Sequence, residues 1–154
     1  MARFVTTEWT RMQLASPKCV VLDPRPFTHY LQGHLKNAIN VPLAKGLDGD
    51  GRLCSVTQLA SWMGSAGVNE HNVPLVYDAY DGQNAAMLAW ILEYLGRTDV
   101  CVMDVFLEQW VAEGREIYFR QGVLVADGVG AGRSADTSER SSGVEGAWGR
   151  FHPV

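Results

Sequence analysis

The sequence has few cysteines and no run of apolar residues long enough to cross a membrane. Its three cysteines, Cys19, Cys54 and Cys101, are scattered along 154 residues. An odd number of distant cysteines fits neither a disulfide framework nor a paired-cysteine zinc site, so we expect a cytoplasmic protein without a metal or other cofactor. The N-terminus lacks the apolar core of a signal peptide, and no apolar run approaches the roughly 18 residues of a membrane span. Neither secretion nor a membrane-bound state is predicted.

Strong charge of one sign is also missing. The net charge is −4, and the basic residues are scattered rather than clustered. Because binding to a phosphate backbone depends on a basic patch, nucleic acid is not an expected partner. Apolar residues, in contrast, make up 47% of the chain. A chain of this length can bury enough of them to form one hydrophobic core without cross-links.

Short apolar runs alternate with helical patterns along most of the chain. The runs are rich in β-branched residues and end at turn-forming residues, which is typical of buried strands in a parallel sheet. We therefore predict an α/β domain with a mainly parallel central sheet flanked by helices. The expected strands are 19–22, 38–41, 73–77 and 100–103, and the expected helices are 9–15, 27–31, 56–64, 85–95 and 107–112.

Aromatic residues are expected to lie in the core. The helix predicted over 85–95 is apolar on nearly every face, which indicates a buried helix. Four tryptophans occur singly within apolar helical segments, and we predict that all four pack in the interior. These residues are Trp9, Trp62, Trp90 and Trp110.

The composition changes after residue 121. Residues 127–146 contain five glycines and four serines among mixed charges, a composition typical of linkers and tails. We predict one folded domain over residues 1–121, followed by a Gly/Ser-rich linker or tail over 122–154 that ends in an aromatic segment.

Two motifs in the first third of the chain resemble a known family. Residues 23–25 form an Asp-x-Arg corner after a predicted strand, and residues 33–42 read Gly-His-Leu-Lys-Asn-Ala-Ile-Asn-Val-Pro. Together they resemble the signature of rhodanese-like domains of sulfurtransferases, which implies the rhodanese-like fold. Asp23, Arg25, Gly33 and His34 match the family motif. We expect an internal ion pair between Asp23 and Arg25 and a structural hydrogen bond from His34.

One position in this signature departs from the family. Asn37 stands where the family usually has glycine. Asparagine adopts the left-handed backbone conformation more readily than most residues, so the turn is expected to be kept.

A later segment resembles the family's active-site loop. Rhodanese chemistry needs a cysteine thiolate with a lowered pKa, held where the N–H groups of a helix N-terminus can cradle an anion. The family's cysteine position falls on Asp78 through the preceding tyrosine, or on Ala79 through the spacing to Gly96, and neither residue carries sulfur. A carboxylate there would also repel an anionic substrate. The loop comprises Asp78, Ala79, Tyr80, Asp81, Gly82, Gln83 and Asn84.

The pattern of residues 5–120 is most similar to the cysteine-less N-terminal half of tandem-domain thiosulfate and 3-mercaptopyruvate sulfurtransferases. The resemblance implies a domain without a catalytic residue of its own, a pseudoenzyme with a regulatory or partner-binding role. A second rhodanese-like half, or a second copy of the chain, is the partner that it implies.

Two alternatives stay open. In the first, the domain is an active thiosulfate sulfurtransferase that uses Cys54 or a cysteine from a partner domain. In the second, Asp78 and Asp81 act as paired carboxylates, either binding a metal or supporting hydrolysis. Two carboxylates make a poor metal site, however, and capping of the following helix explains Asp81 and Asn84 equally well.

Overall fold

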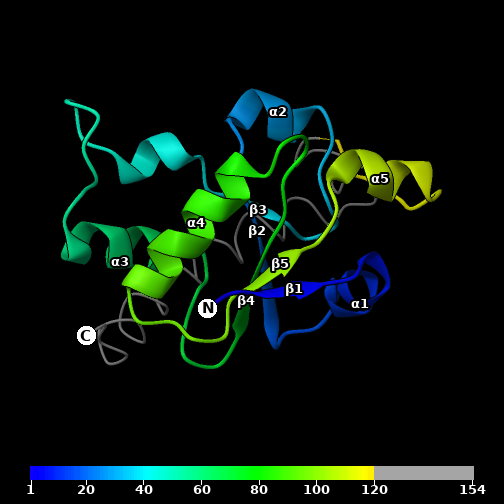
Figure 1. The fold of residues 1–154 in the computed structure, drawn as a ribbon, viewed down its shortest axis with the longest axis horizontal. Helices are drawn as coiled ribbons and strands as arrows, with labels where there is room; N and C mark the ends of the chain where they lie inside the picture. The colour runs from blue at the N-terminus through cyan, green and yellow to red at the C-terminus, as the bar shows by residue number, and fades with distance from the viewer. Residues whose placement is uncertain (120–154) are drawn as a thin grey trace, which may run out of the picture.

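A computed structural model describes residues 1–119 as an α/β domain with a five-stranded sheet (Figure 1). All paired strands run parallel, in the order β1-β5-β4-β2-β3. The predicted fold class is therefore confirmed. The linker or tail predicted over 122–154, which includes the apolar residues 123–125, lies outside the described residues. The strands are β1 (Arg3–Val5), β2 (Cys19–Asp23), β3 (Ile39–Asn40), β4 (Val73–Val76) and β5 (Cys101–Met103).

Helices cover both faces of the sheet. Successive strand residues point to opposite sides, so Leu22 joins the core under α3 and α4, and Val21 joins the core under α1, α2 and α5. Among residues 1–119, no helix has the length and apolar character of a membrane span. The helices are α1 (Thr7–Gln13), α2 (Phe27–Leu31), α3 (Val56–Ser65), α4 (Gln83–Tyr94) and α5 (Leu107–Ala112), with a 3-10 turn η1 (Leu43–Gly46).

Local sequence explains where the helices begin. Ser55 caps α3 in a capping box, in which its hydroxyl accepts from the Gln58 N–H and the Gln58 side chain accepts from the Ser55 N–H, satisfying two donors that the helix leaves free. Thr6 caps α1 by accepting from the Trp9 N–H at 3.1 Å. Strand β1 and turn η1 are too short for a periodic pattern, and neither was predicted.

The prediction of a buried rather than a surface helix over 85–95 is wrong for the outer face of the helix. Helix α4 lies in the outer layer, and only its inner stripe, including Leu88 and Leu92, is buried in the core. Trp90 is 49% exposed and stacks on Tyr94, which is 48% exposed, with ring centroids 5.2 Å apart. Of the four tryptophans predicted to be interior, only Trp110 is buried, whereas Trp9 and Trp62 are half-buried.

The register of the sheet places two loops at the same edge. Strands β2 and β4 are neighbours, with Leu22 opposite Val76. Because the strands are parallel, Asp23, which follows Leu22, and Tyr77, which follows Val76, lie side by side at the carboxyl edge. In open α/β sheets, ligands bind outside this edge, and the two segments identified from the sequence meet there.

Candidate functional site

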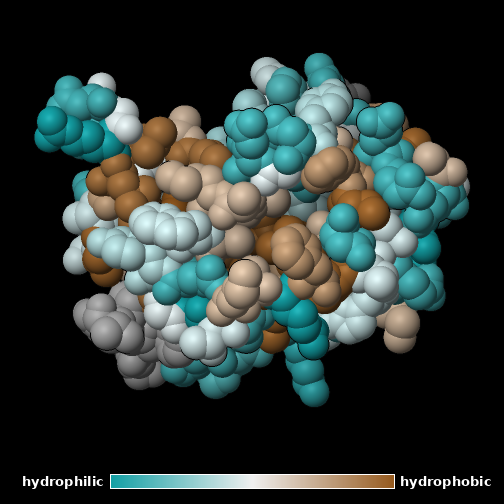
Figure 2. Space-filling view, viewed as in Figure 1, coloured by the Kyte–Doolittle hydropathy of each residue, from teal (hydrophilic) through white to brown (hydrophobic). Residues whose placement is uncertain are grey.

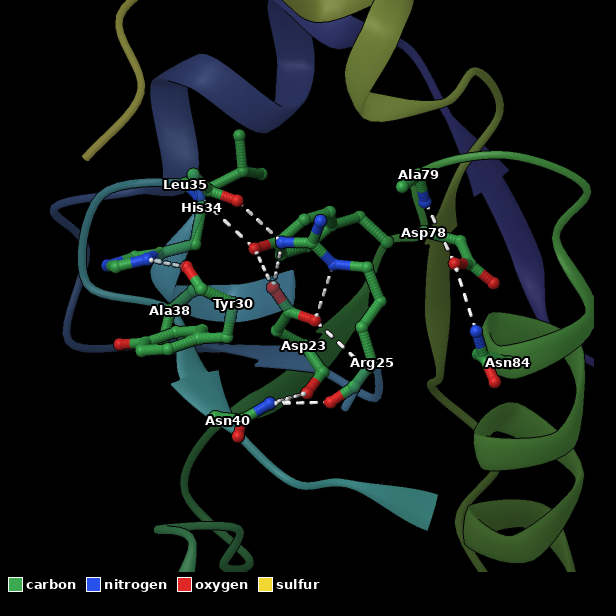
Figure 3. Close-up of polar contacts among 12 residues, drawn as sticks. Asp23, Arg25, Tyr30, His34, Leu35, Ala38, Asn40, Asp78, Ala79 and Asn84 are labelled. Atoms are coloured by element: carbon green, nitrogen blue, oxygen red, sulfur yellow. Dashed lines mark hydrogen bonds and ion pairs between the residues drawn. The ribbon is translucent and has the colours of Figure 1, made fainter. Parts of the chain in front are cut away.

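The corner after β2 is held by a buried ion pair. Arg25 donates through Nε to Asp23 Oδ1 at 2.9 Å and through Nη2 to Asp23 Oδ2 at 2.6 Å, and Nη2 also donates to the Gly33 carbonyl at 2.6 Å (Figure 3). Burial by itself lowers the pKa of Arg25, but the hydrogen bonds and charge of Asp23 outweigh it and raise that pKa above its usual range. The expected ion pair is present, and it joins two parts of the family motif.

Tyr77 links this corner to the neighbouring strand. Its hydroxyl donates to the Asp23 carboxylate and accepts from the Leu35 N–H at 3.2 Å. Burial, followed by the nearby charge of Asp23, raises the pKa of Tyr77 well above its ordinary value, so the phenol stays neutral. Sequence reasoning missed this role. A tyrosine at the end of a buried strand was the available signal, because a buried hydroxyl needs a partner.

The buried His34 ring forms a hydrogen bond inside the domain. Its Nδ1 lies 2.7 Å from the Tyr30 carbonyl, and because a carbonyl only accepts, this nitrogen carries the proton. The imidazole stacks on the Tyr30 ring with centroids 3.7 Å apart, and burial lowers the pKa of His34. Asn37 adopts φ +64°, the left-handed conformation expected for it.

The loop after β4 forms a separate anion-binding arrangement, in which the bound anion is the loop's own carboxylate. Asp78 Oδ1 accepts from the Ala79 N–H at 2.8 Å and from Asn84 Nδ2 at 3.4 Å (Figure 3). Its Oδ2 accepts from the Ala85 N–H in the first turn of α4 at 2.9 Å. Asp78 is 3% exposed. The positive end of a helix dipole stabilises a carboxylate in this position.

The remaining loop residues shape the turn. Gly82 has φ +79° and precedes α4, a conformation that favours glycine. Asp81 Oδ1 accepts from the Gln83 N–H at 3.0 Å, and Tyr80 is 71% exposed. The sequence-predicted site residues thus form two clusters, with Asp23, Arg25, Gly33 and His34 in one and the loop 78–84 in the other.

The three cysteines do not belong to the loop after β4. Cys19 and Cys101 are the first residues of β2 and β5, so both lie at the amino edge of the sheet, opposite the loop. The Cys101 thiol donates to the Asp99 carbonyl at 3.7 Å. Cys54 lies between η1 and α3, where its N–H donates to the Gly46 carbonyl at 2.8 Å.

The Cys19 thiol makes a testable contribution to stability at alkaline pH. Burial, together with the nearby Cys101, raises the pKa of Cys19 to about 12. The unfolded thiol ionises near pH 8.5, so above this pH the unfolded state loses a proton that the folded state keeps, and stability falls as pH rises. The free energy of unfolding is expected to fall between pH 8.5 and 9.5. We expect this fall to be smaller in Cys19→Ala than in the unaltered chain, by up to about 1 kcal/mol.

Urea denaturation at several pH values measures this effect, and Cys54→Ala is the control. An alkaline slope that Cys19→Ala leaves unchanged would contradict the assignment of a half-buried thiol that stays protonated in the folded state.

A cavity of about 330 Å³ opens beside the two clusters, between α2 and α5. Arg25 and Gly33 line it from the first cluster, and Ala79 and Tyr80 line it from the loop after β4. Leu107, Val111 and Ile117 supply apolar walls. Within residues 1–119, no three His, Cys, Asp or Glu side chains gather closely enough to hold a metal ion.

In this α/β domain, the loop after the parallel strand β4 leads into the N-terminus of α4. The domain therefore belongs to the class of α/β proteins whose site lies at the carboxyl edge of a parallel sheet. The sequence model of the rhodanese-like domain matches residues 6–113. The chain belongs to the rhodanese-like domain family.

The chain is similar to sulfurtransferases that are longer than it is. A Synechococcus elongatus protein assigned as a thiosulfate sulfurtransferase is 32% identical over 109 residues, which cover 66% of this chain and 34% of that protein. The thiosulfate sulfurtransferase of Corynebacterium glutamicum is 27% identical over 122 residues, which cover 74% of this chain and 39% of that protein. The chain therefore spans less than half the length of these relatives.

A solved structure shows the same fold. The crystal structure of SseA from Escherichia coli, described as a 3-mercaptopyruvate sulfotransferase with the rhodanese fold, superposes with a TM-score of 0.69 at 21% identity. The match covers 77% of this chain and 52% of that one.

Proposed function

We propose that this domain is a catalytically silent member of the sulfurtransferase family that acts as a partner-binding or regulatory half. The observation that carries the proposal is the position of Asp78. Its carboxylate accepts hydrogen bonds from two backbone N–H groups, and Asp78 is one of the two positions, with Ala79, at which the resemblance puts the family's thiolate. The loop thus keeps its donors, but they are bonded to an internal anion.

The electrostatics of the loop support the same role. A persulfide or a thiosulfate anion needs free donors and positive potential. Here the Ala79 and Ala85 N–H groups already donate to Asp78, and a second anion would meet a negative charge. Sulfur transfer at this loop would therefore require removal of the Asp78 carboxylate.

A partner for such a half would lie over the carboxyl edge. The cavity between α2 and α5 is lined by residues of both site clusters there, and the chain spans less than half of its sulfurtransferase relatives. A second rhodanese-like half or a second copy could supply a cysteine at this edge. Cys54 is the cysteine of this chain that the alternative, an active enzyme, would use.

The proposal is tested by incubating the purified chain with thiosulfate and cyanide and measuring thiocyanate. We expect a rate equal to that of the buffer blank. Turnover that Cys54→Ser abolishes would show an active enzyme and refute the proposal. Turnover that survives replacement of all three cysteines would refute it in favour of chemistry at a residue other than cysteine.

A further inference from the structure

A second surface lies on the other side of the sheet, where α4 passes the edge strand β1. Here the structure has a groove of about 480 Å³, which we call the α4–β1 groove. Figure 2 shows apolar side chains gathered on this face of the molecule. The groove is lined by Phe4, Ala86, Trp90, Val102, Asp104 and Phe106, among others.

The aromatic side chains of the groove are unusually exposed. Phe4 is 69% exposed, Trp90 49% and Phe106 38%. Exposed aromatics that gather at one groove mark interaction sites more often than aromatics scattered singly over the surface. The aromatic stripe continues along α4 through Tyr94, which stacks on Trp90, so the surface extends beyond the groove itself.

The charged side chains that line the groove are all acidic. Asp78, Asp81, Glu93 and Asp104 line it, and among residues 1–119 no Lys, Arg or His side chain does. Asp78 is bonded to backbone N–H groups, and Glu93 pairs with the α-amino group of Met1 at 3.0 Å. Asp81 and Asp104 are exposed at the groove. A cationic group that enters would meet aromatic faces and carboxylates together, which is the combination that stabilises Arg and Lys side chains.

The edge strand adds a backbone element to this surface. Within the described part of the chain, β1 pairs only with β5. On the β5 side, the Arg3 N–H donates to the Val100 carbonyl at 2.8 Å. The Val5 carbonyl accepts from the Asp104 N–H on the same side, also at 2.8 Å. Successive residues of a strand face opposite sides, so the N–H and C=O of Phe4, between Arg3 and Val5, face the open edge. An extended segment can pair there.

We propose that the α4–β1 groove binds an extended segment of a partner protein that carries an Arg or Lys side chain beside apolar residues. The inference rests on the proposed partner-binding role and adds a second binding surface, separate from the cavity between α2 and α5, with a partner of this chemistry. A second copy fits less well, because a twofold contact through the groove would bring Asp81 and Asp104 close to their own copies.

Two small probes test the cation-binding part. Benzamidinium is flat and cationic, and benzamide is a neutral molecule of nearly the same shape. In titrations followed by ¹⁵N-resolved NMR, we expect benzamidinium to shift the Gly82 amide and Trp90 indole signals and to bind about tenfold more tightly than benzamide. Equal binding of the two molecules, or shifts confined to other parts of the protein, would overturn the inference.

Matched variants locate the site. We expect Asp104→Asn and Trp90→Ala each to weaken benzamidinium binding several-fold while the dispersion of the NMR spectrum is kept. Met12→Ala removes an exposed side chain on α1, and Asp50→Asn removes a loop carboxylate, both outside the groove. If these controls weaken binding as strongly as the groove variants do, the α4–β1 groove is not the site.

A peptide pair tests the protein-segment part. One fluorescein-labelled peptide carries a single arginine between apolar residues, and the other carries citrulline, its neutral isostere, at the same position. We expect the arginine peptide to bind at least about tenfold more tightly. Binding of benzamidinium without preference for the arginine peptide would assign the groove to a small cation and overturn the inference. Dimerisation in sedimentation that Trp90→Ala abolishes would assign the groove to a second copy, with the same consequence.

These outcomes are separable from the proposed silence of the loop. Thiocyanate production would refute the silent role and leave peptide binding unaffected. Failure of the peptide and benzamidinium to bind would overturn the groove assignment while the blank rate with thiosulfate stood.

Discussion

Asp23→Ala is expected to destabilise the domain by about 3–5 kcal/mol, the usual cost of leaving a buried charge without its partner. The substitution removes the counterion of Arg25, which is 5% exposed, and the acceptor of the Tyr77 hydroxyl. A loss of this size is a large share of the stability of a small domain. Urea denaturation of the variant and the unaltered chain at pH 7 measures it.

The double variant Asp23→Ala/Arg25→Met provides the control. It removes the unpaired charge together with its partner, so we expect the combined loss to be smaller than the sum of the two single losses. Glu8→Ala removes an exposed partner of Arg11 and should change stability little. A loss for Asp23→Ala no larger than that for Glu8→Ala would show that the corner does not support the fold as the contacts indicate.

Asp78→Cys is expected to create a reactive thiol. The new side chain would begin at the site where the Ala79 and Ala85 N–H groups converge on the Asp78 carboxylate. N–H donors and the positive end of a helix stabilise a thiolate and lower the pKa of a cysteine below about 8.5. We expect the thiol to titrate in the neutral range and to take one sulfur atom from thiosulfate, with release of sulfite. Mass spectrometry detects the added sulfur.

Asp81→Cys is the matched control for this gain. It places a thiol in the same loop, but the Asp81 side chain is exposed and accepts only from the Gln83 N–H among the contacts of residues 1–119. We expect its thiol to react as an ordinary exposed cysteine and to gain no sulfur. A folded Asp78→Cys variant that reacts no faster than Asp81→Cys would show that the loop does not activate a thiol.

Much of the fold could be predicted because its signals are local. Strands β2 and β4 are short runs with β-branched residues, and each is followed by turn-forming residues. Helix α3 begins at a capping box, which the sequence shows as Ser55 followed three residues later by Gln58. Strand β1 could not be found, because three residues with two exposed side chains give no periodic signal. The burial of helix α4 was predicted wrongly, because an apolar composition does not show which face of a helix packs against the sheet.

The candidate site was predictable in its residues and in the short-range ion pair of Asp23 and Arg25, but not in its long-range contacts. The sequence by itself determined that the loop 78–84 carries no sulfur and that Asp23 and Arg25 lie two residues apart at a strand end. Only the tertiary structure decided that Tyr77 joins their ion pair, that Asp78 accepts the donors of its own loop, and that Trp90 lies open in an acidic groove. Composition and short-range spacing are properties of the chain, whereas partners separated by many residues depend on strand order and on which helix face packs against the sheet.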